Sequence, residues 1–176
     1  MEIATTVSRA GYSDLPHGAE AVHVLIIIVE DRPGSLDRVV GMLRRKRANT
    51  LSLSVGSGGA PNIVRVTALV NDSDVSVDNL VEQMRKIVDV RQITKLTSEQ
   101  AVIRELVLVK VGLTTDKVHE VIATADQFGA AIIAITLDTI TFEVSGSEEK
   151  ITKCIDALRA YDIREIARSG CVAAAR

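Results

Sequence analysis

Residues 22–43 read VHVLIIIVEDRPGSLDRVVGML, and the interpretation of the whole chain starts from this stretch. Apolar side chains occupy both alternating sets of residues 22–29, which is the pattern of a β-strand covered on both faces. A helix is predicted over about residues 34–47, because apolar residues recur there at the i, i+3, i+4 and i+7 positions of one helical face. Those residues are Leu36, Val39, Val40 and Leu43. A Pro-Gly pair at positions 33 and 34 separates the strand from the helix.

The rest of the chain continues this alternation of strands and helices, and the same order of elements occurs in both halves. In the first half, the sequence predicts strands at about 50–55, 63–70 and 88–94 and a helix at about 77–87. In the second half it predicts strands at about 103–111, 131–137, 139–144 and 163–168, with helices around 118–128 and 151–158. Each half therefore has the order β-α-β-β-α-β, with a period of roughly 80 residues. This order predicts the α+β class with two ferredoxin-like modules.

The chain accordingly divides into a flexible leader (1–21), a first domain (22–96), a linker (97–102) and a second domain (103–176). The leader has no apolar segment of the kind found in secretory signals, and the apolar run at 22–29 is too short to span a bilayer. A cytoplasmic protein is the default expectation. Two helices cannot cover both faces of such a sheet, so we expect dimerisation or a partner protein to cover the rest.

The composition excludes several classes of protein. Of 176 residues, 47% are hydrophobic and 25% charged, as in a folded domain, and the net charge of -2 gives no general attraction to nucleic acid. Aromatics make up only 2%, whereas RNA-binding sheets of this fold stack bases on aromatic side chains. The histidines lack metal-ligand spacing and there is no Cys-rich motif, so no metal site is expected. The histidines are His17, His23 and His119, and the cysteines are Cys154, expected in the core, and Cys171.

The Pro-Gly loop has the features of an anion site. The first N–H groups of a helix lack partners within the helix and attract negative charge. Gly34 leaves room for a ligand and can adopt positive φ, Pro33 stiffens the loop, and Asp31 can bind an ammonium group. A loop with these groups could hold both ends of a free amino acid. The alternative is ordinary turn chemistry, with Asp31 or Ser35 as a simple helix N-cap.

Six stretches carry a resemblance to a known family. HVLIIIVEDRPGSLDRVVGML resembles the start of an ACT domain, an amino-acid-binding regulatory module. The wider chain, from about residue 23 to 176, resembles the small regulatory subunits of acetolactate synthase (acetohydroxyacid synthase). The further stretches are ANTLSLSVG (48–56), VRVT (64–67), RELVLVKV (104–111), FGAAIIAIT (128–136) and IREIARSG (163–170). The last three are the most distinctive. The resemblance implies an ACT domain followed by an ACT-like C-terminal domain.

The resemblance also implies an effector site between the ACT domains of a homodimer. The N–H groups of Gly34, Ser35 and Leu36 would bind the carboxylate of a branched-chain amino acid such as valine, in the loop that also contains Pro33. Asp31 would bind its ammonium group, and Asn49 would reach the ligand from the neighbouring subunit. Asn49 could instead be a helix C-cap or turn residue. The family commonly has a glycine and an aromatic residue before this asparagine and isoleucine after it; here Arg47, Ala48 and Thr50 stand there.

The implied function is regulatory and not catalytic. The chain would bind the large catalytic subunit of acetolactate synthase, raise its activity and confer feedback inhibition. Thiamine diphosphate, FAD and Mg²⁺ would belong to the partner, with no cofactor in this chain. The second module has GLTTDKV (112–118) where the first has EDRPGSL, so no second effector site is expected, and its role would be dimer and partner contact. A free-standing ACT-type sensor and a small ferredoxin-like enzyme are the alternatives.

The basic run at residues 44–47 has two interpretations. Four cations at the end of a helix complement its dipole, and they could also contact an acidic patch on a partner.

Overall fold

The computed structural model describes residues 22–71 and 76–176. Their contacts divide the described chain into two compact units. The first unit comprises residues 22–103, apart from the gap, together with 170–176, and the second unit comprises residues 104–169. The predicted leader, 1–21, lies outside the described residues.

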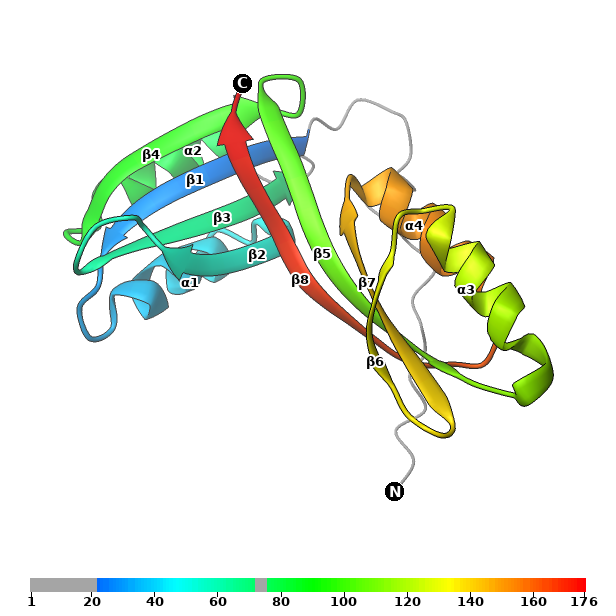
Figure 1. Ribbon diagram of the computed structural model, residues 1–176. Coiled ribbons are helices and arrows are strands. Elements are labelled where there is room, and N and C mark those ends of the chain that lie inside the picture. Colours follow the sequence, from blue (N-terminus) through cyan, green and yellow to red (C-terminus); the bar gives the residue numbers. More distant parts are fainter. Residues whose placement is uncertain (1–21, 72–75) are drawn as a thin grey trace. The chain divides into compact units, whose positions relative to one another are not determined.

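The first unit contains a four-stranded antiparallel sheet with the order β2-β3-β1-β4 (Figure 1). Its elements are β1 (Val22–Glu30), α1 (Ser35–Arg45), β2 (Asn49–Ser57), β3 (Ile63–Asn71), α2 (Val77–Met84) and β4 (Val90–Thr97). The predicted β-α-β-β-α-β order is therefore confirmed. The long apolar strand β1 is in the interior of the sheet, as its two covered faces require.

The second half repeats this topology, with the sheet order β6-β7-β5-β8. Its elements are β5 (Ala101–Gly112), a 3₁₀ turn (Thr115–Lys117), α3 (Val118–Asp126), β6 (Ala131–Ile135), β7 (Thr139–Gly146), α4 (Glu148–Leu158) and β8 (Ile163–Ala175). The α+β class with two ferredoxin-like modules is confirmed. The last strand is longer than the predicted 163–168, and its final residues, 170–176, belong to the first unit by their contacts. The sequence-based division had placed them in the 103–176 domain.

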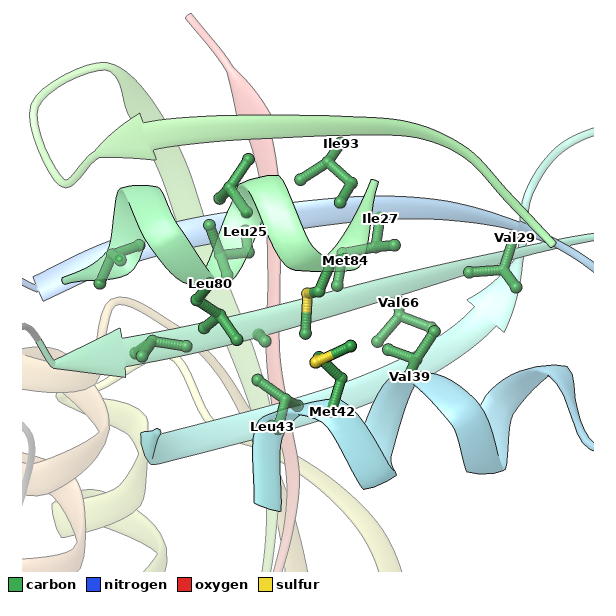
Figure 2. Close-up of a cluster of buried hydrophobic side chains, with 14 residues drawn as sticks. Leu25, Ile27, Val29, Val39, Met42, Leu43, Val66, Leu80, Met84 and Ile93 are labelled. Atoms are coloured by element: carbon green, nitrogen blue, oxygen red, sulfur yellow. The ribbon is translucent and has the colours of Figure 1, made fainter. Parts of the chain in front are cut away.

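One core lies between the sheet and the two helices of the first unit, and Figure 2 shows side chains from both layers meeting there. Leu25 and Ile27 of β1 face this core and are fully buried. Met42 from α1 and Met84 from α2 project into the space between the helices and the sheet, where their flexible side chains fill the gap (Figure 2). Because β1 and α1 both pack into this core, the loop that joins them is held at one end of the sheet.

The end of β8 covers the opposite face of the first sheet. The Ser54 hydroxyl donates to the Cys171 carbonyl at 2.6 Å, and the Cys171 N–H donates to the Ser52 hydroxyl at 2.8 Å. Arg65 donates to the Ala173 carbonyl at 2.6 Å. Gly170 has a φ of 75°, and a β-carbon there would lie 3.2 Å from the Ser52 hydroxyl oxygen, so this crossing requires glycine. Part of the face expected to need a partner is thus covered by the chain itself.

The second unit has its own core, in which Cys154 is fully buried, as predicted. Beside it, Glu105 of β5 accepts two hydrogen bonds from the Arg168 guanidinium of β8, at 2.9 and 2.6 Å. The Glu105 side chain is only 2% exposed. The most distinctive sequence stretches, RELVLVKV and IREIARSG, therefore meet through a buried carboxylate and its partner.

Candidate functional site

The Pro-Gly loop opens α1 with a glycine in the left-handed conformation. Gly34 is the N-cap residue, with φ 78° and ψ 1°, and no side chain caps the helix. The alternative in which Asp31 or Ser35 is the N-cap is therefore wrong. The loop from Asp31 to Gly34 and Leu36 are exposed, whereas Ser35 is buried.

The hydrogen bonds of the loop leave some of its donors open. The Ser35 N–H donates to the Arg32 carbonyl at 3.0 Å, closing a turn around Pro33 and Gly34. Among the described residues, the N–H groups of Gly34 and Leu36 have no hydrogen-bond acceptor. Two of the three N–H groups predicted to bind a carboxylate are thus available, and the third is engaged locally. Open N–H groups at a helix start are the ordinary means of binding an anion.

Asp31 lies at the neighbouring pocket. Its backbone N–H donates to the Asn62 carbonyl at 2.8 Å, which ties the loop to the β2–β3 turn. The pocket has a volume of about 310 Å³ and is lined by Glu30, Asp31, Arg32, Pro61, Asn62 and Ile63. Glu30 is paired with Arg32 at 2.8 Å and with Arg91, whereas no ion pair of Asp31 is found among the described residues. Asp31 can therefore bind an ammonium group at this end of the sheet.

Arg38 is a further candidate for the site, one that the sequence motifs do not indicate. Its guanidinium donates to Asp89 at 2.6 Å, and Asp89 is 2% exposed. A β-carbon on Gly34 would lie 3.2 Å from Nη1 of Arg38. The Nη1 group of this guanidinium, which Asp89 holds in place, therefore lies beside the open helix start, where it could donate a hydrogen bond to a carboxylate. The sequence does show that Arg38 follows Gly34 by one helical turn, which predicts that the two lie close together. It does not predict the ion pair of Arg38 with Asp89, because these two residues are far apart in the sequence.

The basic run contributes to a second cavity on the helical side of the first unit. This cavity has a volume of about 730 Å³ and is lined by Asp37, Arg38, Gly41, Met42, Arg44, Arg45, Lys86, Ile87 and Val88. Arg44 and Arg45 form the last turn of α1, as the dipole argument expects. Arg38 belongs to this cavity and Asp31 to the smaller pocket, so the Pro-Gly loop lies between the two.

Asn49 lies at the opposite end of the sheet from the loop. It begins β2 and pairs with Asn71 of β3, whereas Glu30, just before the loop, pairs with Ile63 at the other end of β3. Eight residue steps of about 3.4 Å separate these ends, or about 27 Å. One copy of the chain therefore does not bring Asn49 and Gly34 together.

Arg47, two residues before Asn49, explains the end of α1. Arg47 has a φ of 51°, and the N–H groups of Arg47 and Ala48 donate to the carbonyls of Arg44 and Leu43, both at 3.0 Å. This is a Schellman motif with arginine in the left-handed position that glycine normally fills. The alternative in which Asn49 is the C-cap is wrong, because Arg47 takes the left-handed conformation.

The second module begins its first helix differently. The 3₁₀ turn Thr115–Lys117 leads into α3, so no open glycine turn occurs there. Over residues 22–71 and 76–176, no cluster of His, Cys, Asp or Glu is suited to hold a metal ion. In the same described part of the chain, no helix is long and apolar enough to cross a membrane.

The chain matches two family models. Residues 25–92 match the model described as an AHAS small subunit-like ACT domain, which places the first module in the class of ACT regulatory domains. Residues 104–176 match the model described as the small subunit of acetolactate synthase.

Curated relatives match along most of their length. The chain is 35% identical over 154 residues to the probable acetolactate synthase small subunit of Archaeoglobus fulgidus, covering 88% of this chain and 96% of that protein. It is 32% identical over 154 residues to the acetolactate synthase small subunit of Bacillus subtilis, covering 87% and 90%. The chain therefore belongs to the family of acetolactate synthase small subunits, the regulatory and non-catalytic partners of that enzyme.

A solved structure agrees with the fold. The crystal structure of the acetolactate synthase small subunit from Thermotoga maritima superposes with a TM-score of 0.81 at 29% identity, covering 88% of this chain and 97% of that one.

Proposed function

We propose that this chain binds the large catalytic subunit of acetolactate synthase, raises its activity, and confers feedback inhibition by valine or a related branched-chain amino acid. The thiamine diphosphate, FAD and Mg²⁺ of the reaction would be held by the catalytic subunit, and both proteins would act in the cytoplasm. Family membership supports the partnership. The effector site is supported by the geometry of the Pro-Gly loop.

The single observation that carries the effector site is the uncapped helix start at Gly34. The N–H groups of Gly34 and Leu36 are available, and Arg38 lies beside them, which suits a carboxylate. Asp31 is exposed on the other side of the loop, which suits an ammonium group. A free amino acid carries its ammonium and carboxylate groups on the same carbon atom, so groups on the two sides of one loop can recognise both.

The site would be completed by a second copy of the chain. In an antiparallel pairing of two β2 strands about a two-fold axis, the Asn49 end of one strand lies beside the Ser57 end of the other. The Ser57 end is also the end of the sheet where the Pro-Gly loop lies, because Ser57 pairs with Val64 and Glu30 with Ile63. Such a homodimer would bring Asn49 of one copy to the effector bound by the other. The large separation of Asn49 and Gly34 within one chain favours this arrangement.

The effector would act by shifting a population. A ligand that contacts both copies stabilises one arrangement of the dimer. The activity of a catalytic subunit bound to the dimer would then depend on which arrangement is populated. Inhibition then requires that the effector-bound arrangement supports catalysis less well.

Complementation between variants tests the shared site. Gly34→Asp places a negative charge against the ligand carboxylate, and aspartate tolerates the left-handed conformation. Asn49→Ala removes the group supplied by the other copy. Calorimetric titration with valine, leucine and isoleucine should show binding by the wild type and little by either variant alone.

A mixture of the two variants gives the decisive result. A heterodimer contains one site with both changes and one site with neither, so an equimolar mixture should regain about a quarter of the wild-type sites. If the site lies within one chain, the mixture regains none. If the wild type binds no amino acid, either alone or with the catalytic subunit, the effector site is refuted.

A further inference from the structure

The edge strand β6 leaves an apolar surface uncovered. All residues from 131 to 138 are exposed, and Ile132, Ile133, Ile135 and Leu137 have exposed fractions of 41, 49, 62 and 105%. β6 pairs with β7 on one side only and ends the sheet order β6-β7-β5-β8. Its other edge therefore offers a row of backbone N–H and C=O groups beside large apolar side chains.

Part of this surface continues the core of the second unit. Ile132 pairs with Phe142, and Ile135 pairs with Ile140. Directly paired residues point to the same face of a sheet, and Phe142 and Ile140 are each 1% exposed in the core. Ile132 and Ile135 are thus on the core face, but the helices do not cover them. A partner on this edge would complete a core that the unit itself leaves open.

The charges on the edge strands differ in a consistent way. β4, an outer strand of the first sheet, carries Arg91 and Lys95, and β8 carries Arg164, Glu165 and Arg168. Charged side chains on an edge oppose pairing with another chain. β6 has the sequence AIIAI, with no charged residue and no proline. Of the four edge strands, only β6 and β2, the edge already proposed to pair with a second copy, lack this protection among the described residues.

We infer that β6 is a second self-association surface, on which the β6 strand of another copy of this chain pairs in an antiparallel manner. The segment Ala131-Ile132-Ile133-Ala134 reads the same in both directions, so a two-fold pairing sets alanine opposite alanine and isoleucine opposite isoleucine. No like charges are brought together along the strand.

The ends of the strand are also complementary. Asp138, which accepts from the Thr136 hydroxyl at 3.0 Å, follows the C-terminal end of β6. Lys150 lies at the N-terminal end, where its Nζ is 3.9 Å from the position of a β-carbon on Gly129. Antiparallel pairing brings the Asp138 end of each copy to the Lys150 end of the other. Opposite charges then meet at both ends of the paired strands. This complementarity favours a second copy of this chain over a different protein as the partner.

Cysteine cross-linking tests this contact directly in the full-length chain. Facing Cα atoms of an antiparallel pair are about 4.5–5.5 Å apart, within the range that a disulfide spans. In this register Ile132 of one copy faces Ile133 of the other, so an equimolar mixture of Ile132→Cys and Ile133→Cys chains sets two cysteines face to face, and the native Cys154 and Cys171 are buried. Under mild oxidation, this mixture should form a covalent dimer roughly tenfold faster than the control Leu106→Cys. Leu106 is 37% exposed but lies on the inner strand β5.

Charge insertion provides an independent readout. Ile133→Lys sets an ammonium group opposite the apolar Ile132 of the other copy on each side of the axis, and should weaken self-association by roughly tenfold in sedimentation experiments. The control is Val88→Lys, at a residue that is 80% exposed and outside the sheet edges, and it should leave self-association unchanged. Circular dichroism checks that both variants fold.

Two results would overturn the inference. Equal cross-linking of the Ile132→Cys and Ile133→Cys mixture and the Leu106→Cys control would do so, as would unchanged self-association of Ile133→Lys. If this variant self-associates normally and also no longer binds the catalytic subunit, the surface belongs to that subunit instead. None of these results depends on effector binding at Gly34.

Discussion

Two glycines of the same helix should respond in opposite ways to the same added methyl group. Gly34 has a φ of 78°, and its β-carbon would meet Nη1 of Arg38 at 3.2 Å. Gly41 is in the interior of α1, and a β-carbon there would have nothing within 4 Å. Gly34→Ala should therefore destabilise the chain, whereas Gly41→Ala should stabilise it.

The magnitudes follow from the two backbone conformations. A left-handed alanine costs about 1–2 kcal/mol, and the reduced entropy of the unfolded chain offsets about 0.5–1 kcal/mol of this. Gly34→Ala should thus lower the free energy of unfolding by about 1 kcal/mol. Alanine in a helix interior gains about 0.5–1 kcal/mol over glycine, so Gly41→Ala should raise it by that amount.

Urea denaturation followed by circular dichroism measures the difference. For a slope of about 1–1.5 kcal/mol/M, the two midpoints should separate by roughly 1 M or more, with the wild type between them. Equal destabilisation by both substitutions, or stabilisation by Gly34→Ala, would refute the assigned conformation of the loop. In the same variants, effector binding should weaken only in Gly34→Ala.

Three further predictions concern the helix end, the buried ion pair and the cysteines. Arg47→Gly should raise the free energy of unfolding by about 0.5–1 kcal/mol, since glycine relieves the left-handed arginine; a loss of stability in urea denaturation would count against the Schellman motif. Arg168→Met should lower it by about 3 kcal/mol at pH 7, because it leaves the Glu105 carboxylate buried without its guanidinium partner, and Glu105→Gln in the same background should restore part of the loss. Burial raises the pKa of the Cys154 thiol, so Cys154 and Cys171 should react with a thiol reagent only as fast as the chain unfolds; rapid labelling of the native protein would contradict their burial.

The local features of the fold could be predicted from sequence because they depend on neighbouring residues. The apolar run at 22–29, the helical spacing after Gly34 and the repeated order of elements each have a short-range physical cause. The left-handed Gly34 was anticipated for the same reason. The identity of the N-cap was not, because aspartate, serine and glycine are all suitable there and only the folded loop decides between them.

Long-range pairings could not be read from the sequence. The small residues after Arg168 have no pattern that predicts a strand. Cys171 and Ala173 nevertheless form hydrogen bonds with Ser52 and Arg65, more than a hundred residues away in the sequence. Arg38 and Asp89 form an ion pair, but the residues around each of them in the sequence predict only an exposed charged side chain. The exposure of β6 was also hidden, because an apolar strand looks the same in sequence whether or not helices cover it.

The most direct test of the regulatory role is acetolactate formation by the cognate catalytic subunit, measured with and without this chain and with increasing valine, for the wild type and Gly34→Asp. We expect both forms to raise the activity, and valine to lower it again only with the wild type. A catalytic subunit whose activity does not change when the wild-type chain is added would contradict the account.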